Sequence, residues 1–174
     1  MTVSQDIVLG SGDTFKDDFT GCLDGWWASN GIWETGVPTY GPTDTYSSPN
    51  SAATILTGSY PDWVDSTFVS PSVVLPDINA GEEIDLRFWH WFSINSHDIL
   101  HVKVQEETAP GEWGAWTDLN AFYRNSGGVW TYPLIDLSAY AGKKIRIGFV
   151  LNNSGSYPGT GAGWYLDDVS ITTP

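Results

Sequence analysis

The chain contains almost no stretch in which apolar residues recur at the three- and four-residue spacing of an amphipathic helix. Its apolar residues fall in short runs rich in β-branched and aromatic side chains, bounded by glycine, proline, asparagine or serine. Such runs follow one another with no helix between them, which argues against a parallel α/β sheet and predicts an all-β sandwich or barrel. The expected strands are 14–19, 32–34, 52–56, 66–69, 73–75, 83–95, 99–106, 116–119, 130–134, 144–151 and 163–172.

Alternation inside the longest runs gives each strand one apolar face and one face that mixes cations with aromatic rings. If these strands share one sheet, its outer face is a basic and aromatic strip suited to an acidic or carboxylate-bearing ligand. The residues expected to form this ligand-binding surface are Arg87, Trp89, Trp91, His101, Lys103 and Arg146. The alternative is an ordinary solvated face whose two tryptophans are covered by a crossing loop, since any half-exposed sheet alternates.

Length and charge restrict the possible partners. A chain of 174 residues suits a single domain, which we place at 13–174 after a leader or linker at 1–12. The net charge of −14 argues against nucleic acid and against anionic membrane surfaces. No apolar run is long enough for membrane insertion. The first six residues lack the pattern of a signal peptide, so the chain either stays inside the cell or belongs to a longer secreted protein.

Tryptophan is unusually frequent, with ten residues, and indole rings are surfaces on which sugar rings stack. We expect Trp33, Trp130 and Trp164 in the core, together with a hydrogen-bonded His90. Consecutive Trp26 and Trp27 cannot both point inward from a strand. Trp63, Trp113 and Trp116 fall in or beside loops, and the long polar stretch 35–51 is expected to border the binding surface.

Several short motifs resemble a known family. They are Trp33–Pro38 followed by Gly41-Pro42, Gly58-Ser59-Tyr60, Ser70-Pro71, Leu137–Gly142, and the string Gly163–Ile171. Over roughly 13–174 the series resembles the MAM-like jelly-roll modules of secreted bacterial proteins. Similar modules accompany immune-inhibitor-A-type metalloproteases and subtilisin-like proteases, and the cleaved-adhesin modules of gingipains are related. Eukaryotic MAM domains carry paired cysteines, whereas this chain has only Cys22.

The resemblance implies a two-sheet antiparallel jelly-roll β-sandwich that is not an enzyme. It implies an extracellular, secreted or cell-surface module that binds carbohydrate or adheres within a larger parent polypeptide. We expect a monomer whose ligand is a glycan or an extracellular protein. A second interpretation is a protein-facing scaffold that packs on and stabilises a secreted protease domain. A third is a polysaccharide-degrading lyase or glycosidase, with Tyr123, Arg124 or His101 as candidate lyase residues.

Two pairs of adjacent aspartates lie near the ends of the chain, where the first and last strands of a jelly roll commonly run side by side. Calcium prefers six to eight oxygen ligands, and similar modules bind calcium in this region. We therefore predict structural calcium at Asp17, Asp18, Asp167 and Asp168, with Asp24 and Asp98 as further contributors. The alternative is that one aspartate of each pair faces water while the other caps a turn.

Overall fold

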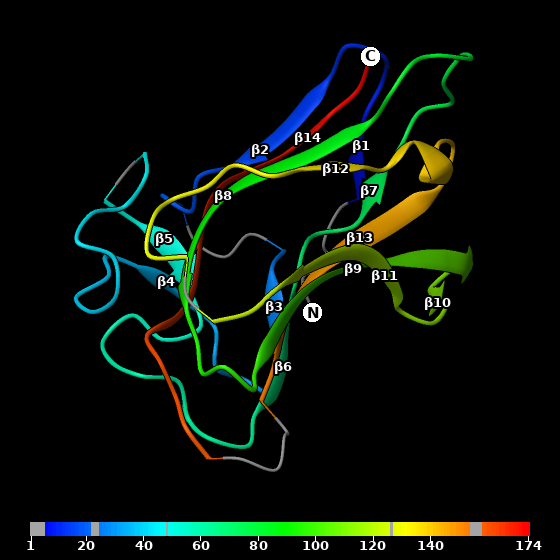
Figure 1. The fold of residues 1–174 in the computed structure, drawn as a ribbon. Coiled ribbons are helices and arrows are strands. Elements are labelled where there is room, and N and C mark those ends of the chain that lie inside the picture. Colours follow the sequence, from blue (N-terminus) through cyan, green and yellow to red (C-terminus); the bar gives the residue numbers. More distant parts are fainter. Residues whose placement is uncertain (1–5, 22–24, 48, 126, 154–157) are drawn as a thin grey trace.

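The computed structural model describes residues 6–21, 25–47, 49–125, 127–153 and 158–174. It is an antiparallel-dominated jelly-roll β-sandwich in which two sheets face each other across an apolar core (Figure 1). Cys22 and Asp24 lie outside the described residues. Within the described residues the helical structure is the short 3₁₀ turn η1 (Ser138–Tyr140), and no helix there has the length and apolar character needed to cross a membrane.

The eight-stranded sheet has β13 at its centre. Its strands are β1 (Ile7–Val8), β3 (Trp27–Ser29), β6 (Asp65–Val69), β7 (Val73–Val74), β9 (Ile99–Ala109), β10 (Glu112–Trp113), β11 (Thr117–Tyr123) and β13 (Lys144–Asn152). Strand β9 pairs with one edge of β13, while β6 and β7 share the other edge. Strands β10 and β11 pair with β9, and β3 pairs with β6. Strand β1 runs parallel to β7.

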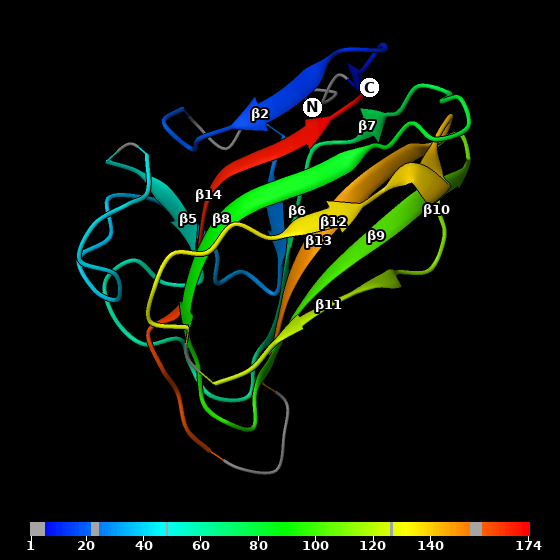
Figure 2. The same cartoon turned by 45° about the horizontal axis from the view of Figure 1, so that its top comes forward.

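The six-stranded sheet has β14 at its centre. Its strands are β2 (Thr14–Asp17), β4 (Glu34–Gly36), β5 (Ser51–Ala53), β8 (Asp85–Ser93), β12 (Leu134–Asp136) and β14 (Gly163–Thr172). Strand β8 pairs with one edge of β14, while β2 and β5 share the other edge. Strand β4 extends the sheet beyond β5, and β12 extends it beyond β8. Figure 2 shows β8 and β14 in one layer, with β9 and β13 in the layer behind it.

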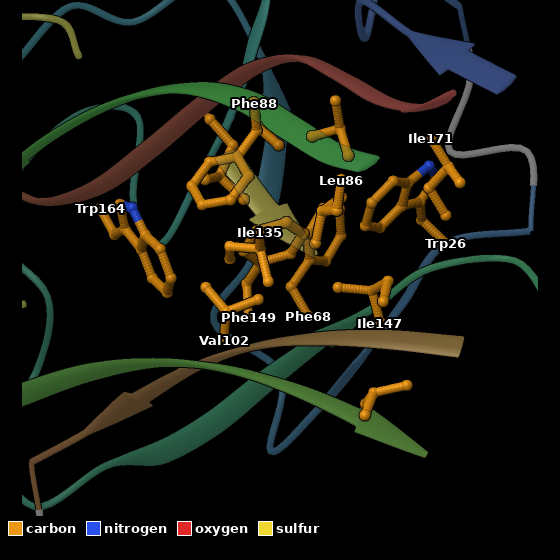
Figure 3. Packing of buried hydrophobic residues seen from close by; sticks show 14 of the residues in the cluster. Trp26, Phe68, Leu86, Phe88, Val102, Ile135, Ile147, Phe149, Trp164 and Ile171 are labelled. Carbon is orange, nitrogen blue, oxygen red and sulfur yellow. The ribbon is translucent and has the colours of Figure 1, made fainter. Parts of the chain in front are cut away.

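The core lies between the two sheets and is filled by the apolar faces that alternation predicts. Strand β8 alternates buried and half-buried side chains along its whole length. Phe88 and Phe149, from opposite sheets, meet edge to face with ring centroids 5.0 Å apart (Figure 3). Trp26 and Trp33 both stack on Phe68, at 4.6 and 4.9 Å between centroids. Large rings therefore fill the space between the layers, which suits the high tryptophan content.

The expected strands match most of the observed ones, with three omissions. Strand β3 begins at Trp27, β10 is a two-residue strand after the turn that ends β9, and β1 lies in the segment expected to be a leader or linker. The described part of that segment is packed on the sandwich: Leu9 is buried in the core, and β1 pairs with β7. So short a strand carries no alternation that the sequence can reveal.

Candidate ligand-binding site

The sandwich divides the predicted ligand-binding residues between two opposite outer faces. Arg87, Trp89 and Trp91 lie on β8 and face outward from the six-stranded sheet. The other three, His101, Lys103 and Arg146, lie on β9 and β13 and face outward from the eight-stranded sheet. The prediction of one continuous strip is wrong, because alternation identifies the face of a strand but not the sheet to which the strand belongs.

On the eight-stranded sheet, Arg146 lies among three tryptophans. Its guanidinium carbon is 4.2 Å from the ring centroid of Trp113, 5.4 Å from that of Trp27 and 5.8 Å from that of Trp116. These distances fit cation–π contacts, which strengthen as water is excluded. We call Trp27, Trp113, Trp116, Lys144 and Arg146 the Arg146 surface. It borders a groove of about 260 Å³ between β3, the β9–β10 turn and β13.

Local sequence explains how these rings reach the outer face. Trp26, just before β3, is buried, and Trp27, the first residue of β3, is 45% exposed, so the two neighbouring rings point in opposite directions. The Trp116 ring lies over Gly148 of β13, because a Cβ added at Gly148 would stand 2.7 Å from that ring. The glycine thus leaves the space that the indole occupies. The sequence did not link these three tryptophans to Arg146, and among them only Trp27 carried a signal, since the Trp26-Trp27 pair requires one of its two indoles to face outward.

The charge of Arg146 has no acidic partner in the described part of the chain. Its Nε donates a hydrogen bond to the neutral Oε1 of Gln105 at 2.8 Å, and burial lowers the pKa of the guanidinium. Lys144 on the same strand is neutralised, with Nζ 2.8 Å from Asp6 and 3.1 Å from Glu107. These contacts raise the pKa of Lys144. Arg146 therefore offers an uncompensated cation beside aromatic rings on a strongly acidic protein.

His101 and Lys103 lie farther along the same outer face. The Nδ1 of His101 is 2.9 Å from a carboxylate oxygen of Asp118. Lys103 lies opposite Gly148 on β13 and opposite Asp118 on β11. The structure thus brings His101, Lys103 and Arg146 onto one face, with Lys103 nearest the Gly148 position that Trp116 covers.

On the six-stranded sheet, loops cover part of the predicted surface. The Trp89 ring is stacked between Tyr46 at 3.6 Å and Tyr132 at 4.6 Å, measured between centroids. The guanidinium carbon of Arg87 lies over the Tyr132 ring, 5.2 Å from its centroid. The crossing-loop interpretation is confirmed for Trp89, which is occupied on both faces by side chains of the protein.

The three tryptophans predicted for the core have different outcomes. Trp33 and Trp164 are buried, which confirms the prediction. Trp130 packs instead on a small second cluster formed by Ala53, Leu56, Ala162 and Tyr165, on the outer side of the six-stranded sheet. The prediction that Trp130 lies in the core is wrong, because Trp130 belongs to the segment before β12 and not to a strand.

The four aspartates predicted to hold calcium do not form one group. Asp17 accepts hydrogen bonds from the backbone N–H of Phe19 and from Nε1 of Trp26, while Asp18 accepts from Thr20. Asp167 is fully buried and accepts from Ser47, and burial raises its pKa. The described residues contain no group of three or more His, Cys, Asp or Glu side chains placed to hold a metal ion.

Asp167 and Asp168 nevertheless lie together at a bulge in β14, where the register to β8 shifts. Asp168 has a positive φ of 47°, and Ser47 Oγ lies 3.1 Å from both carboxylates. Lys16 Nζ is 3.0 Å from Asp168 and supplies a local positive charge. Two carboxylates and a hydroxyl fit part of a calcium site but fall short of a complete set of ligands. The other predicted contributor, Asp98, is buried against Tyr60.

The residues considered for lyase chemistry do not converge. Tyr123 packs against the core beside His90, at 4.4 Å between ring centroids, and burial raises its pKa to about 12. His101 faces outward on the neighbouring strand. The two side chains therefore point to opposite sides of the eight-stranded sheet, and the fold does not bring them together.

Comparison with known proteins gives one curated relative at substantial identity, and no family model matches the chain. Bacillopeptidase F of Bacillus subtilis (strain 168) is 34% identical over 175 residues, which cover 99% of this chain and 11% of that protein. The chain thus spans about a tenth of the length of the relative it matches. The MAM-like resemblance stays a prediction.

Solved structures share the fold at low identity. The CBM22-1 xylan-binding domain from Paenibacillus barcinonensis Xyn10C has a TM-score of 0.57 at 20% identity, covering 95% of this chain and 97% of that one. The K1 cleaved adhesin domain of Lys-gingipain from Porphyromonas gingivalis W83 has a TM-score of 0.56 at 18% identity, covering 94% of this chain and 99% of that one. TmCBM61, solved with beta-1,4-galactotriose, has a TM-score of 0.56 at 14% identity, covering 90% of this chain and 94% of that one. The chain is thus a jelly-roll sandwich, similar in sequence to a segment of a bacillopeptidase.

Proposed function

We propose that the chain is a non-catalytic extracellular module of a larger secreted polypeptide that binds acidic carbohydrate through the Arg146 surface. The observation that carries this proposal is the half-buried Arg146 guanidinium, which has three indole rings around it and no acidic partner among the described residues. A guanidinium pairs with a carboxylate through two parallel hydrogen bonds, and the adjoining rings stack on apolar sugar faces. A uronate residue combines both features.

The comparisons support this function as a proposal. Solved structures of the same fold include domains whose names state xylan binding and a complex with a galactotriose, and another is a cleaved adhesin domain. The sequence relative is a bacillopeptidase, of which the chain matches 11%. These relations favour a binding part of a larger protein, and a position outside the cell gives such a module access to polysaccharide.

Affinity electrophoresis through uronate polymers and through neutral polysaccharides tests the proposed function. We expect retardation by at least one uronate polymer, and loss of that retardation in Arg146→Met, which keeps the length of the side chain and removes its charge. Trp63→Asn is the matched control, because Trp63 is 58% exposed outside the Arg146 surface and has a φ of 62° that asparagine tolerates. Unchanged migration in every polymer would contradict the proposal.

The protein-facing scaffold is the second candidate, and one observation favours it. Exposed apolar side chains gather on the loops outside the six-stranded sheet, among them Tyr46 and Tyr132, which enclose Trp89. A scaffold module bound to a protease domain would bury such a patch. If no polysaccharide retards the protein while a bacillopeptidase-type catalytic domain gains thermal stability in its presence, this second candidate replaces the first.

We also propose that calcium stabilises the module at Asp167 and Asp168. The buried Asp167 carboxylate beside a second carboxylate is a site where a divalent cation would relieve repulsion. The Lys16 ammonium is the competing explanation, since it already neutralises Asp168. Calcium should raise the melting temperature of the metal-stripped protein, and Asp168→Asn should abolish that rise. An unchanged melting temperature in millimolar calcium would assign the neutralising role to Lys16 alone.

A further inference from the structure

A second hollow lies on the opposite side of the molecule from the Arg146 surface. Loop 37–44 crosses the outer face of the six-stranded sheet and borders two adjoining hollows of about 500 and 260 Å³, both open to solvent. Both spaces are lined by Trp91 and by Gly41–Thr43, so that Trp91 forms a shared wall. Tyr40 borders the larger space and Trp130 the smaller one. We call this feature the Trp91 hollow.

The walls of the Trp91 hollow are held in place by specific contacts. The Tyr165 hydroxyl lies 2.7 Å from the carbonyl oxygen of Tyr40, to which it can donate. Gly41 lies against the same ring with a φ of 93°, and a Cβ there would stand 2.6 Å from Tyr165 atoms. On the other side, Nε1 of Trp130 donates to the carbonyl of Asp44 at 3.0 Å. Because both sides of the loop are anchored, the hollow exists before any ligand binds, which lowers the entropic cost of binding.

The lining of the larger space selects an uncharged ligand. It consists of two prolines, two threonines, Tyr40, Gly41, Ala162 and Trp91, and includes no charged side chain. Threonine hydroxyls and loop backbone groups offer hydrogen bonds, while the rings of Trp91 and Tyr40 offer apolar surfaces. Asp44 lines the smaller space but not the larger one, and its carboxylate can accept hydrogen bonds from hydroxyl groups. Aromatic walls, hydroxyl partners and a volume within the range of small-ligand sites together match a neutral sugar.

From this geometry we infer that the Trp91 hollow is a second binding site, which takes a neutral saccharide independently of the Arg146 surface. It goes beyond the proposed function, because it shares no residue with the Arg146 surface and lies on the other sheet. A module with one site on each outer face links two polysaccharide segments, one acidic and one neutral.

Calorimetric titration with neutral oligosaccharides tests the inference, using cellohexaose, xylohexaose and β-1,4-galactotriose as probes. At least one of these probes should bind the unmodified protein when the probe is titrated up to millimolar concentration. Trp91→Ala should lose about tenfold in affinity, the amount that one aromatic contact supplies. Since Trp91 also packs on Tyr165, Tyr40→Ala is the second variant: Tyr40 is 47% exposed and anchors the loop through its backbone.

The outcomes separate this inference from the proposed function. Binding of a neutral probe that is weakened in Tyr40→Ala and Trp91→Ala, and kept in Trp63→Asn, supports the Trp91 hollow. Absence of binding by all three probes overturns it, even where a uronate polymer is still bound. Binding that survives in Tyr40→Ala and is lost in Arg146→Met also overturns it, because the neutral sugar then occupies the Arg146 surface. A protein partner that binds at the Trp91 hollow and that none of the neutral sugars displaces would overturn the inference as well.

Discussion

Trp164 and His90 meet in the core, where the indole Nε1 of Trp164 donates a hydrogen bond to Nδ1 of His90 at 3.2 Å. An indole N–H can only donate, so Nδ1 of His90 must be unprotonated and the neutral ring carries its proton on Nε2. Both side chains are almost fully buried, and burial lowers the pKa of His90 to about 4. The prediction of a hydrogen-bonded core histidine is confirmed.

This pair predicts a pH-dependent loss of stability. The folded pKa of His90 lies below its ordinary value of 6.5, so its contribution is complete above about pH 6.5 and is lost as pH falls towards 4. The full effect is roughly 3 kcal/mol. Urea unfolding of the protein and of His90→Gln at about pH 7.5 and about pH 4.5 measures it as a difference. The advantage of the unmodified protein over the variant should shrink at the lower pH. An advantage that stays constant would refute the assignment.

Leu9 tests whether the N-terminal segment belongs to the sandwich. Leu9 is 7% exposed in the core, whereas its neighbour Val8 is 70% exposed. Leu9→Ala should lower the free energy of unfolding by about 2 to 3 kcal/mol, and Val8→Ala should change it by less than about 0.5 kcal/mol. Equal effects of the two substitutions in urea unfolding would mean that the segment is a linker after all.

Gly41 tests the anchoring of loop 37–44. Gly41→Ala introduces a methyl group 2.6 Å from the Tyr165 ring at a φ of 93°, and should cost about 1 to 3 kcal/mol in unfolding free energy. Gly81→Ala isolates the backbone effect, because Gly81 has a φ of 87° and nothing within 4 Å of its Cβ position. The clash with Tyr165 predicts that Gly41→Ala is the more destabilising of the two. Similar losses would show that the loop is not pressed against that ring.

Gly148 tests the position of Trp116 on the Arg146 surface. A methyl group at Gly148 would stand 2.7 Å from the Trp116 ring and 2.9 Å from Thr67. Gly148→Ala should therefore displace the indole, change the tryptophan fluorescence and weaken uronate binding by about tenfold. Gly58→Ala is the control, since its Cβ position has no neighbour within 4 Å. Uronate affinity equal to that of the unmodified protein would remove Trp116 from the binding surface.

Sequence alone predicted the fold well, because period-two alternation in β8, β9 and β13 is a local property of each strand. The jelly-roll arrangement followed from the family resemblance, and solved structures share it. Three short strands, β1, β3 and β10, were missed because two or three residues carry no periodic signal.

The candidate site was predicted only in part. Alternation placed Trp89 and Arg146 on outward faces, yet it could not show that these faces belong to different sheets. Sheet membership depends on pairings between distant segments, such as β9 with β13, which no local pattern encodes. The rings around Arg146 come from β3 and from the segment 112–116, and their meeting depends on the same long-range pairings.

Calorimetric titration of the unmodified protein and Arg146→Met with short oligogalacturonates tests the central claim most directly. Binding should be present in the unmodified protein, weaken as salt is added, and fall by roughly tenfold or more in Arg146→Met, because a charge-assisted hydrogen bond is lost. Trp63→Asn should bind as the unmodified protein does. Oligogalacturonate affinity that is the same with and without the Arg146 guanidinium, or absent from both proteins, would contradict the assignment of the Arg146 surface to an acidic carbohydrate.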